Sequence, residues 1–223
     1  MKMLKSVGFL VLVIFASQAF SATAPSAHEV IEQTTKKVMG IIGEAKGYFD
    51  KDPQRFYNEV ENVMGEVIDF DSFARGVMGK YASSELYRSL KTKEEQALLR
   101  ARVKRFSDVF KDGLIQTYAK GLLAFNGNRV EVLPAEDEGS SATVRQHIYG
   151  DGDKPFEVQY KLRRDQKGDW KLRNVTIEAI NLGKVYQSQF YQAMKQYNDD
   201  LDKTIDNWSV DPTGGSDKAV DAG

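Results

Sequence analysis

Residues 142–163, ATVRQHIYGDGDKPFEVQYKLR, decide the fold, because in this stretch the sequence changes from a helical period to a strand period. Apolar and polar residues alternate on both sides of the turn signal GDGD at 150–153, which predicts an antiparallel hairpin. A short strand at 130–132 and a fourth strand, from Trp170 to about Ile180 after the turn at 167–169, extend the hairpin. The sequence therefore predicts a four-stranded antiparallel sheet with one covered face.

Helical periods flank this sheet on both sides. A Thr92–Glu95 capping box and the turn signal at 126–128 bound a long helix, and Asp71 and Gly79 are the expected cap and end of a short one. We predict helices from Ser26 to the break at 52–53, from there to near Asp69, at 71–79, at 92–125 and from 183 to about Trp208. This order predicts an α+β domain with the helices packed on one face of a curved sheet.

The two ends of the chain differ in composition from this pattern. Lys2 and Lys5 precede an apolar run from Val7 to Phe15, and small residues follow, which is the layout of a cleavable secretory signal peptide. We assign 1–22 to the signal, 23–210 to a single domain and 211–223, DPTGGSDKAVDAG, to a disordered tail. The run is shorter than the ~20 apolar residues of a membrane span, so we expect a soluble exported protein. We expect the signal to be cleaved between Ala19 and Ala24.

Composition argues against several classes of function. The chain has no cysteine, so neither a disulfide framework nor a cysteine-based zinc site is expected. Loss of Lys2 and Lys5 takes the formal net charge from −1 to −3, which gives no reason to expect a nucleic-acid partner. His28 and His147 are the two imidazoles, and neither lies near a nucleophile motif. We expect no metal, no cofactor and no enzymatic activity.

Large apolar residues are abundant, with twelve Phe, ten Tyr and six Met. They fit an ordinary packed core. They fit equally a curved sheet that encloses an apolar pocket with its helices. Periodicity does not distinguish a filled interior from a ligand-filled one.

Two segments resemble the MlaC family, the toluene-tolerance auxiliary components that serve Gram-negative bacteria as periplasmic phospholipid carriers. They are FDSFARGVMGKY at 70–81 and WKLRNVTIEAINLGKVYQSQF at 170–190. The family pattern is W-x-apolar-x-D-apolar, then E-G-apolar-S-apolar, then Y-R-x-Q-F. The matching residues are Phe70, Asp71, Ala74, Val77, Met78, Gly79, Tyr81, Trp170, Leu172, Val175, Ile177, Glu178, Ile180, Leu182, Tyr186, Gln189 and Phe190. The departures are Asn174 for Asp, Ala179 for Gly, Asn181 for Ser and Gln187 for Arg.

This resemblance covers essentially the whole mature chain. It implies a cone like that of nuclear transport factors, a deep apolar cavity between sheet and helices, and a diacyl phospholipid as ligand. It further implies a monomeric periplasmic shuttle between an outer-membrane lipoprotein–porin complex and an inner-membrane ABC transporter with MCE domains, which maintains outer-membrane lipid asymmetry and solvent tolerance. Neither the direction of transfer nor the number of acyl chains follows from any residue.

The acyl-chain pocket then has three predicted walls. The inner sheet positions share a face by alternation: Val144, Ile148, Val158, Tyr160 and Leu162. The opposing helical wall comprises Phe73, Val77, Phe106, Phe110, Leu114 and Tyr118. The junction with the last helix comprises Ile177, Ile180, Leu182, Tyr186 and Phe190.

Two other functions remain open on the sequence alone. One is a protein-interaction module of the same fold with a solid core. The other is a small-molecule enzyme of that fold, which would need an inward Asp or His, and the strand alternation places none inward.

Overall fold

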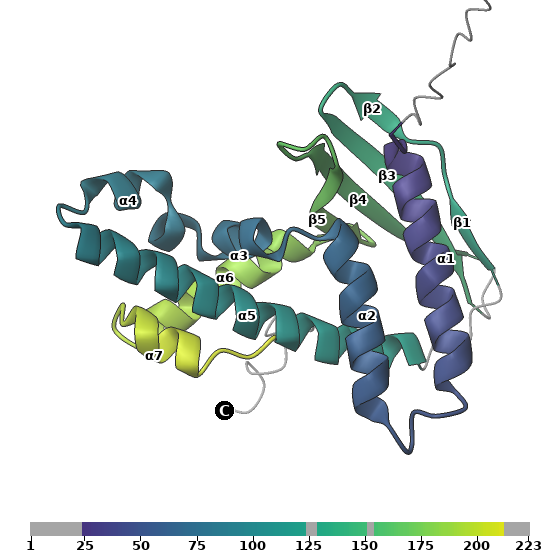
Figure 1. Cartoon of the computed structure of the whole chain (residues 1–223), viewed down its shortest axis with the longest axis horizontal. Coiled ribbons are helices and arrows are strands. Elements are labelled where there is room, and N and C mark those ends of the chain that lie inside the picture. The colour runs from purple at the N-terminus through teal and green to yellow at the C-terminus, as the bar shows by residue number, and fades with distance from the viewer. Residues whose placement is uncertain (1–23, 124–128, 151–153, 212–223) are drawn as a thin grey trace, which may run out of the picture.

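The computed structural model describes residues 24–123, 129–150 and 154–211. The predicted signal peptide at 1–22, the predicted turns at 126–128 and 151–153, and the tail beyond Asp211 lie outside the described residues. In the described part, a curved sheet with two helices across it adjoins a group of helices arranged around one long helix (Figure 1). The predicted α+β class is confirmed.

The sheet is antiparallel throughout and has the strand order β1-β3-β4-β5-β6, with β2 beside the start of β3. Its strands are β1 (Arg129–Val132), β2 (Glu136–Glu138), β3 (Ser141–Tyr149), β4 (Phe156–Arg164), β5 (Trp170–Ile177) and β6 (Ile180–Asn181). The central hairpin has the register that the alternation predicts, with Val144 opposite Tyr160 and Ile148 opposite Phe156. Strand β2 was not predicted, because its sequence, EDE, is exposed and carries no apolar pattern.

An irregularity in β5 changes which of its residues face the helices. Leu172 lies opposite Leu162, and Asn174 lies opposite Lys161, so Arg173 is an extra residue in the register. This bulge places both Leu172 and Val175 on the covered face, although three positions separate them.

Two helices cross the covered face. Helix α1 (Ala27–Ala45) lies over β1 and β3, and α2 (Pro53–Val67) packs beside it (Figure 1). Each begins at a side-chain cap: Ser26 forms a capping box with Glu29, and Asp52 accepts from the amide of Arg55. At the end of α2, Ile68 makes an isolated parallel bridge to Leu172, which attaches this helical hairpin to the edge of β5. We call α1 and α2 together the α1–α2 hairpin.

The remaining helices form a helical lobe around α5. They are α3 (Phe70–Met78), the 3-10 helix η1 (Gly79–Ala82), α4 (Ser84–Ser89), α5 (Lys93–Leu123), α6 (Leu182–Gln196) and α7 (Leu201–Asp206). The predicted capping box opens α5, since the amide of Thr92 donates to Glu95 and the amide of Glu95 donates to the Thr92 hydroxyl. Helix α5 is about 46 Å long at 1.5 Å per residue. It therefore extends well beyond the sheet (Figure 1).

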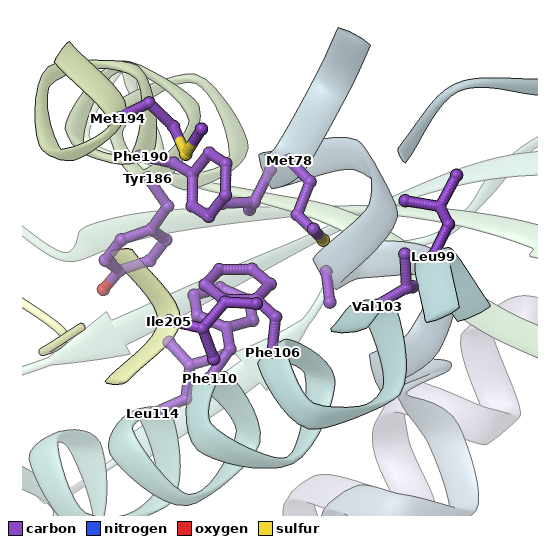
Figure 2. Close-up of a cluster of buried hydrophobic side chains, with 12 residues drawn as sticks. Met78, Leu99, Val103, Phe106, Phe110, Leu114, Tyr186, Phe190, Met194 and Ile205 are labelled. Carbon is purple, nitrogen blue, oxygen red and sulfur yellow. The ribbon is translucent and has the colours of Figure 1, made fainter. Parts of the chain in front are cut away.

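The lobe is held by an aromatic core in which side chains of α5 face those of α6 (Figure 2). The rings of Phe106 and Phe110 stack at 5.6 Å, and Phe190 meets Phe106 edge-on at 4.8 Å. Gly79 ends α3, as predicted. Its φ of +54° lies in a region that favours glycine. A Cβ at that position would also collide with the Tyr191 hydroxyl.

The prediction that Asp71 caps α3 is wrong. The cap is Asp69, whose Oδ1 accepts from the amide of Ser72 at 3.0 Å and whose Oδ2 lies 2.9 Å from Arg173 Nη1. Burial opposes ionisation of Asp69, but the hydrogen bonds from Ser72 and the Arg173 guanidinium outweigh it, so the pKa of this carboxyl lies below its ordinary value. Asp71 lies in the first turn and accepts instead from the hydroxyl of Ser107 on α5 at 2.5 Å.

The prediction of one helix from Gly183 to Trp208 is also wrong, because the chain breaks between α6 and α7. Asn198 and Asp199 have positive φ values of 53° and 60°, and the Asp200 side chain caps α7 by accepting from the amide of Lys203. Three consecutive Asn and Asp residues favour such a turn, since their side chains tolerate the left-handed region. Helix α4 was not predicted either, because its six residues are too few to establish a period.

Strand β5 ends at Ile177 rather than continuing to Ile180 as predicted. Glu178 and Ala179 form a two-residue turn with φ values of +48° and +70°, and Ile180 returns antiparallel opposite Ile177. In the related family the position of Ala179 is usually glycine, which takes a positive φ without steric cost.

We therefore expect Ala179→Gly to stabilise the protein by about 0.5–1 kcal/mol. The substitution relieves the left-handed strain at this position, but the greater freedom of glycine in the unfolded chain offsets part of that gain. Urea unfolding measures the difference. As a control, Ala101→Gly on the exposed side of α5 should destabilise by about 1 kcal/mol. Equal losses in both variants would contradict the assigned strain.

Candidate functional site

An apolar pocket of about 170 Å³ lies between the α1–α2 hairpin and the covered face of the sheet. The α1–α2 hairpin forms one wall, β1, β3, β4 and β5 form the other, and the last turn of α5 contributes Leu122. The pocket is lined by Ile31, Thr34, Thr35, Val38, Met39, Met64, Val67, Ile68, Leu122, Val130, Gln146, Ile148, Tyr160 and Leu172. No charged side chain is among these lining residues.

Helical and strand periods explain how these residues come together. On α1, Ile31, Thr34 or Thr35, and Val38 recur at three-to-four spacing and so form one face toward the sheet. On β3, Gln146 and Ile148 face that helix, because residues two apart on a strand share a side. The bulge in β5 adds Leu172 to the same surface.

A chain of three hydrogen-bonding side chains interrupts this apolar lining. Gln146, which is only 3% exposed, donates from Nε2 to the Thr35 hydroxyl at 2.7 Å and accepts at Oε1 from the Tyr160 hydroxyl at 2.6 Å. Burial raises the pKa of the Tyr160 hydroxyl above its ordinary value, so this hydroxyl remains a neutral donor. We call this the Thr35–Gln146–Tyr160 bridge, since it connects α1 to β3 and β4.

Of the predicted sheet wall, Ile148 and Tyr160 line the pocket. Val144 and Leu162 belong instead to a buried cluster beneath α1. The cluster also contains Ala27 and Ile31 of α1 and Trp170 of β5. Val158 is buried on the same face of β4 and is not among the pocket-lining residues. The structure thus brings the sheet positions onto one face, as predicted, and places two of the five at the pocket.

The predicted helical wall lies elsewhere, in the aromatic core of the helical lobe. Its residues Phe73, Val77, Phe106, Phe110, Leu114 and Tyr118 pack there against α6. Tyr186 and Phe190, predicted at the junction, also belong to this core (Figure 2). The Tyr118 and Tyr186 hydroxyls are 2.6 Å apart, and Tyr186 and Phe190 have no exposed surface. The physical reason is the length of α5, whose middle faces α3 and α6, while its C-terminal turn reaches the sheet.

The other three junction residues occupy different surroundings. Leu182 packs at the border of the aromatic core, and Ile177 is half-buried on the covered face of β5. Ile180 is 57% exposed, because it follows the turn at 178–179 rather than continuing the strand. Contact of these predicted residues with an acyl chain stays a prediction.

The contribution of α1 and α2 to the pocket was not predicted from the sequence. Thr34 and Thr35 stand within an otherwise apolar stripe, and Gln146 stands at an inward strand position between Val144 and Ile148. Polar side chains at core positions require hydrogen-bond partners. That requirement is the sequence signal that pairs α1 with β3.

Among the described residues that line the pocket, Tyr160 is the one with a titratable side chain, and neither histidine belongs to the lining. His28 Nδ1 lies 2.9 Å from the carbonyl oxygen of Leu133, and His147 Nε2 lies 3.7 Å from Glu157. Among the described residues, no three His, Asp or Glu side chains are grouped so that they could hold a metal ion. No helix within the described ranges combines the length and apolarity that crossing a bilayer requires.

We expect Thr35→Val to destabilise the fold by about 1–3 kcal/mol, because it leaves the buried Nε2 of Gln146 without its acceptor. The combined variant Thr35→Val, Gln146→Leu, Tyr160→Phe should regain most of that loss, since all three polar partners are removed together. Unfolding in urea compares the two. A triple variant less stable than Thr35→Val alone would contradict this account of the bridge.

Comparison with known proteins identifies relatives of the whole described region. The family profile of the MlaC protein matches residues 32–210. The toluene tolerance protein ttg2D of Pseudomonas putida is 34% identical over 204 residues, which cover 91% of this chain and 88% of that protein. A phospholipid-binding protein from Ralstonia solanacearum, solved in complex with a phospholipid, has the same fold, with a TM-score of 0.66 at 20% identity over 82% of this chain and 94% of that one. The chain therefore belongs to the MlaC family.

Proposed function

We propose that this protein is a non-enzymatic phospholipid carrier whose apolar pocket accepts acyl chains. The observation that carries the proposal is the pocket itself, an uncharged hollow between the sheet and a helical hairpin. Each methylene buried there contributes about 0.8 kcal/mol, so one long acyl chain gains ~10 kcal/mol, enough to retain an insoluble lipid in water. The phospholipid bound to the Ralstonia solanacearum protein of the same fold supports this ligand class.

The pocket has to widen for this function. Its volume of about 170 Å³ is close to that of cavities of about 150 Å³ that accommodate a single benzene. An acyl chain therefore requires the α1–α2 hairpin to move away from the sheet. Met39 and Met64 on the hairpin side suit such a change, because methionine side chains are flexible and fill irregular spaces.

Membership of the MlaC family supports a proposal for the route of the lipid. We propose that the chain works in the periplasm as a monomer, after cleavage of the signal peptide at 1–22, with a single lipid-binding domain at 23–210 and a tail at 211–223. It exchanges diacyl phospholipid with an outer-membrane lipoprotein–porin complex and an inner-membrane MCE-domain ABC transporter. This traffic maintains the lipid asymmetry of the outer membrane and thereby tolerance to solvents.

Lipid extraction tests the proposal directly. The protein is expressed in a bacterial host, purified, denatured and extracted, and the extract is analysed by mass spectrometry. We expect diacyl phospholipid of mixed headgroup in stoichiometric amount. A folded, monodisperse protein without lipid would refute the carrier function and favour the alternative, an interaction module of the same fold with a solid core.

A cavity-filling variant locates the site. Val38 is 8% exposed and lines the pocket, so Val38→Phe places a phenyl ring in the space that an acyl chain needs. We expect bound lipid to fall several-fold while the free energy of unfolding changes by less than about 1.5 kcal/mol. Leu98→Phe is the control, because Leu98 is 51% exposed and lies on α5 away from the pocket. Equal lipid content in both variants would place the acyl chains outside this pocket.

A further inference from the structure

A second hollow of about 190 Å³ adjoins the apolar pocket and shares Thr34 and Val67 with it. It lies where α1 begins, α2 ends and the turn between β4 and β5 approaches them. Its lining includes the cationic side chains of Lys37, Arg164 and Lys171. We call it the basic cleft.

Within the described residues, two of these three cations form no direct ion pair, although Lys171 interacts at longer range with Asp165. The ammonium of Lys171 donates to the carbonyl oxygen of Glu66 at 2.6 Å, and Arg164 Nη1 donates to that of Gly168 at 2.6 Å. Lys37 alone forms an ion pair, with the Glu66 carboxylate. The lining thus has three cationic side chains and two acidic ones, Glu66 and Asp169, and a formal charge of +1.

The two ends of the sheet also differ in charge: the end near the cleft is the more positive one. The segment RRDQKGDWKLR at 163–173, part of which lines the cleft, has five cationic and two acidic residues. At the opposite end of β4 and β5, the acidic side chains of Glu131, Glu157 and Glu178 outnumber Arg129 and Lys154. Screening limits charge effects to about 10 Å at ordinary ionic strength, so the cations that border the cleft matter most.

We infer that the basic cleft binds the phosphate of the bound phospholipid, so that its acyl chains run from Thr34 and Val67 along the pocket toward Ile148. This inference rests on the proposed carrier function. It assigns one orientation to the lipid and names the positioning groups: Lys37, Lys171 and Arg164. A phosphate outside the pocket mouth keeps its hydration while the tails are buried, which avoids the cost of burying a charge.

Trp170 provides a second observation at the same place. It borders the cleft and is 4% exposed, and its Nε1 has no acceptor among the described residues. Buried donors of this kind normally have a partner. Because this nitrogen is itself enclosed, a glycerol or phosphate oxygen would supply the acceptor only after the cleft has widened around Trp170.

Glu66 acts in this arrangement as an internal competitor. Its carboxylate occupies Lys37, which a phosphate would otherwise engage. Substitutions of opposite sign should therefore have opposite effects on affinity: Lys37→Gln and Lys171→Gln weaken phospholipid binding, and Glu66→Gln strengthens it. Because Lys37 and Glu66 are about half exposed, each change is about two- to five-fold.

The test titrates each variant with a pyrene-labelled phosphatidylglycerol and, separately, with the corresponding pyrene-labelled diacylglycerol, which lacks the phosphate. We expect the lysine and Glu66 variants to change the affinity for phosphatidylglycerol, relative to that for diacylglycerol in the same variant, in the directions stated. Lys161→Gln is the matched control, since Lys161 is an exposed lysine on β4 outside the cleft. Urea unfolding verifies that every variant remains folded.

The other outcomes separate the possible failures. Wild-type protein that binds neither probe refutes the carrier function and this inference with it. In another outcome, the wild-type protein binds both probes, and Lys171→Gln and Glu66→Gln have the same affinity for phosphatidylglycerol as Lys161→Gln. This outcome overturns only the orientation of the lipid. A third arm adds millimolar inorganic phosphate at constant ionic strength. In the last outcome, inorganic phosphate binds in a way that requires Lys171 while the affinity for phospholipid does not depend on Lys171. That result would make the cleft a site for free anions and would also overturn the inference.

Discussion

The edge-on packing of Phe106 and Phe110 on α5 against Phe190 and Tyr186 on α6 constrains the rest of the molecule. It commits the middle of the longest helix to the helical lobe, so α5 contributes a single residue, Leu122, to the pocket. The covered face of the sheet is left to the α1–α2 hairpin. Two helices meet a curved sheet over part of its surface, and the apolar pocket is the space that they leave.

The α1–α2 hairpin is attached both by apolar packing and by specific polar contacts. Ala27 and Ile31 of α1 pack in the buried core on the sheet, and residues of both helices pack against α5: Ala45, Phe56 and Val60 contact Ile115 and Ala119. The Thr35–Gln146–Tyr160 bridge connects α1 to the middle of the sheet, and Ile68 and Lys171 connect the end of α2 to β5. Hydrogen bonds of this kind contribute about 1 kcal/mol each, far less than the burial of an acyl chain. If lipid enters between the hairpin and the sheet as proposed, the burial of its acyl chains has to offset the loss of some apolar packing as well as the loss of these hydrogen bonds.

The sequence contains enough local signal for most elements but not for the assembly of the pocket. Alternation on β3 and β4, the Thr92–Glu95 capping box and the glycine at 79 each specify structure through near neighbours, and these predictions are confirmed. The breaks at 178–179 and 198–199 were missed, because residues other than glycine occupy left-handed conformations there. The helical wall was placed on α5 because its apolar stripe is the longest. Periodicity identifies an inward face without identifying which partner it meets, and tertiary packing assigned that stripe to α6.

The polar part of the pocket consists of an alcohol, an amide and a phenol. None of the three gains or loses a proton at any acidity a bacterium tolerates, since burial moves the Tyr160 hydroxyl further from titration. The interior thus keeps one electrical state in acid and in alkali alike. A carrier with this lining would hold an acyl chain equally well in either medium, and only the charged side chains of the basic cleft, outside the pocket, would make its affinity respond to salt or to acid.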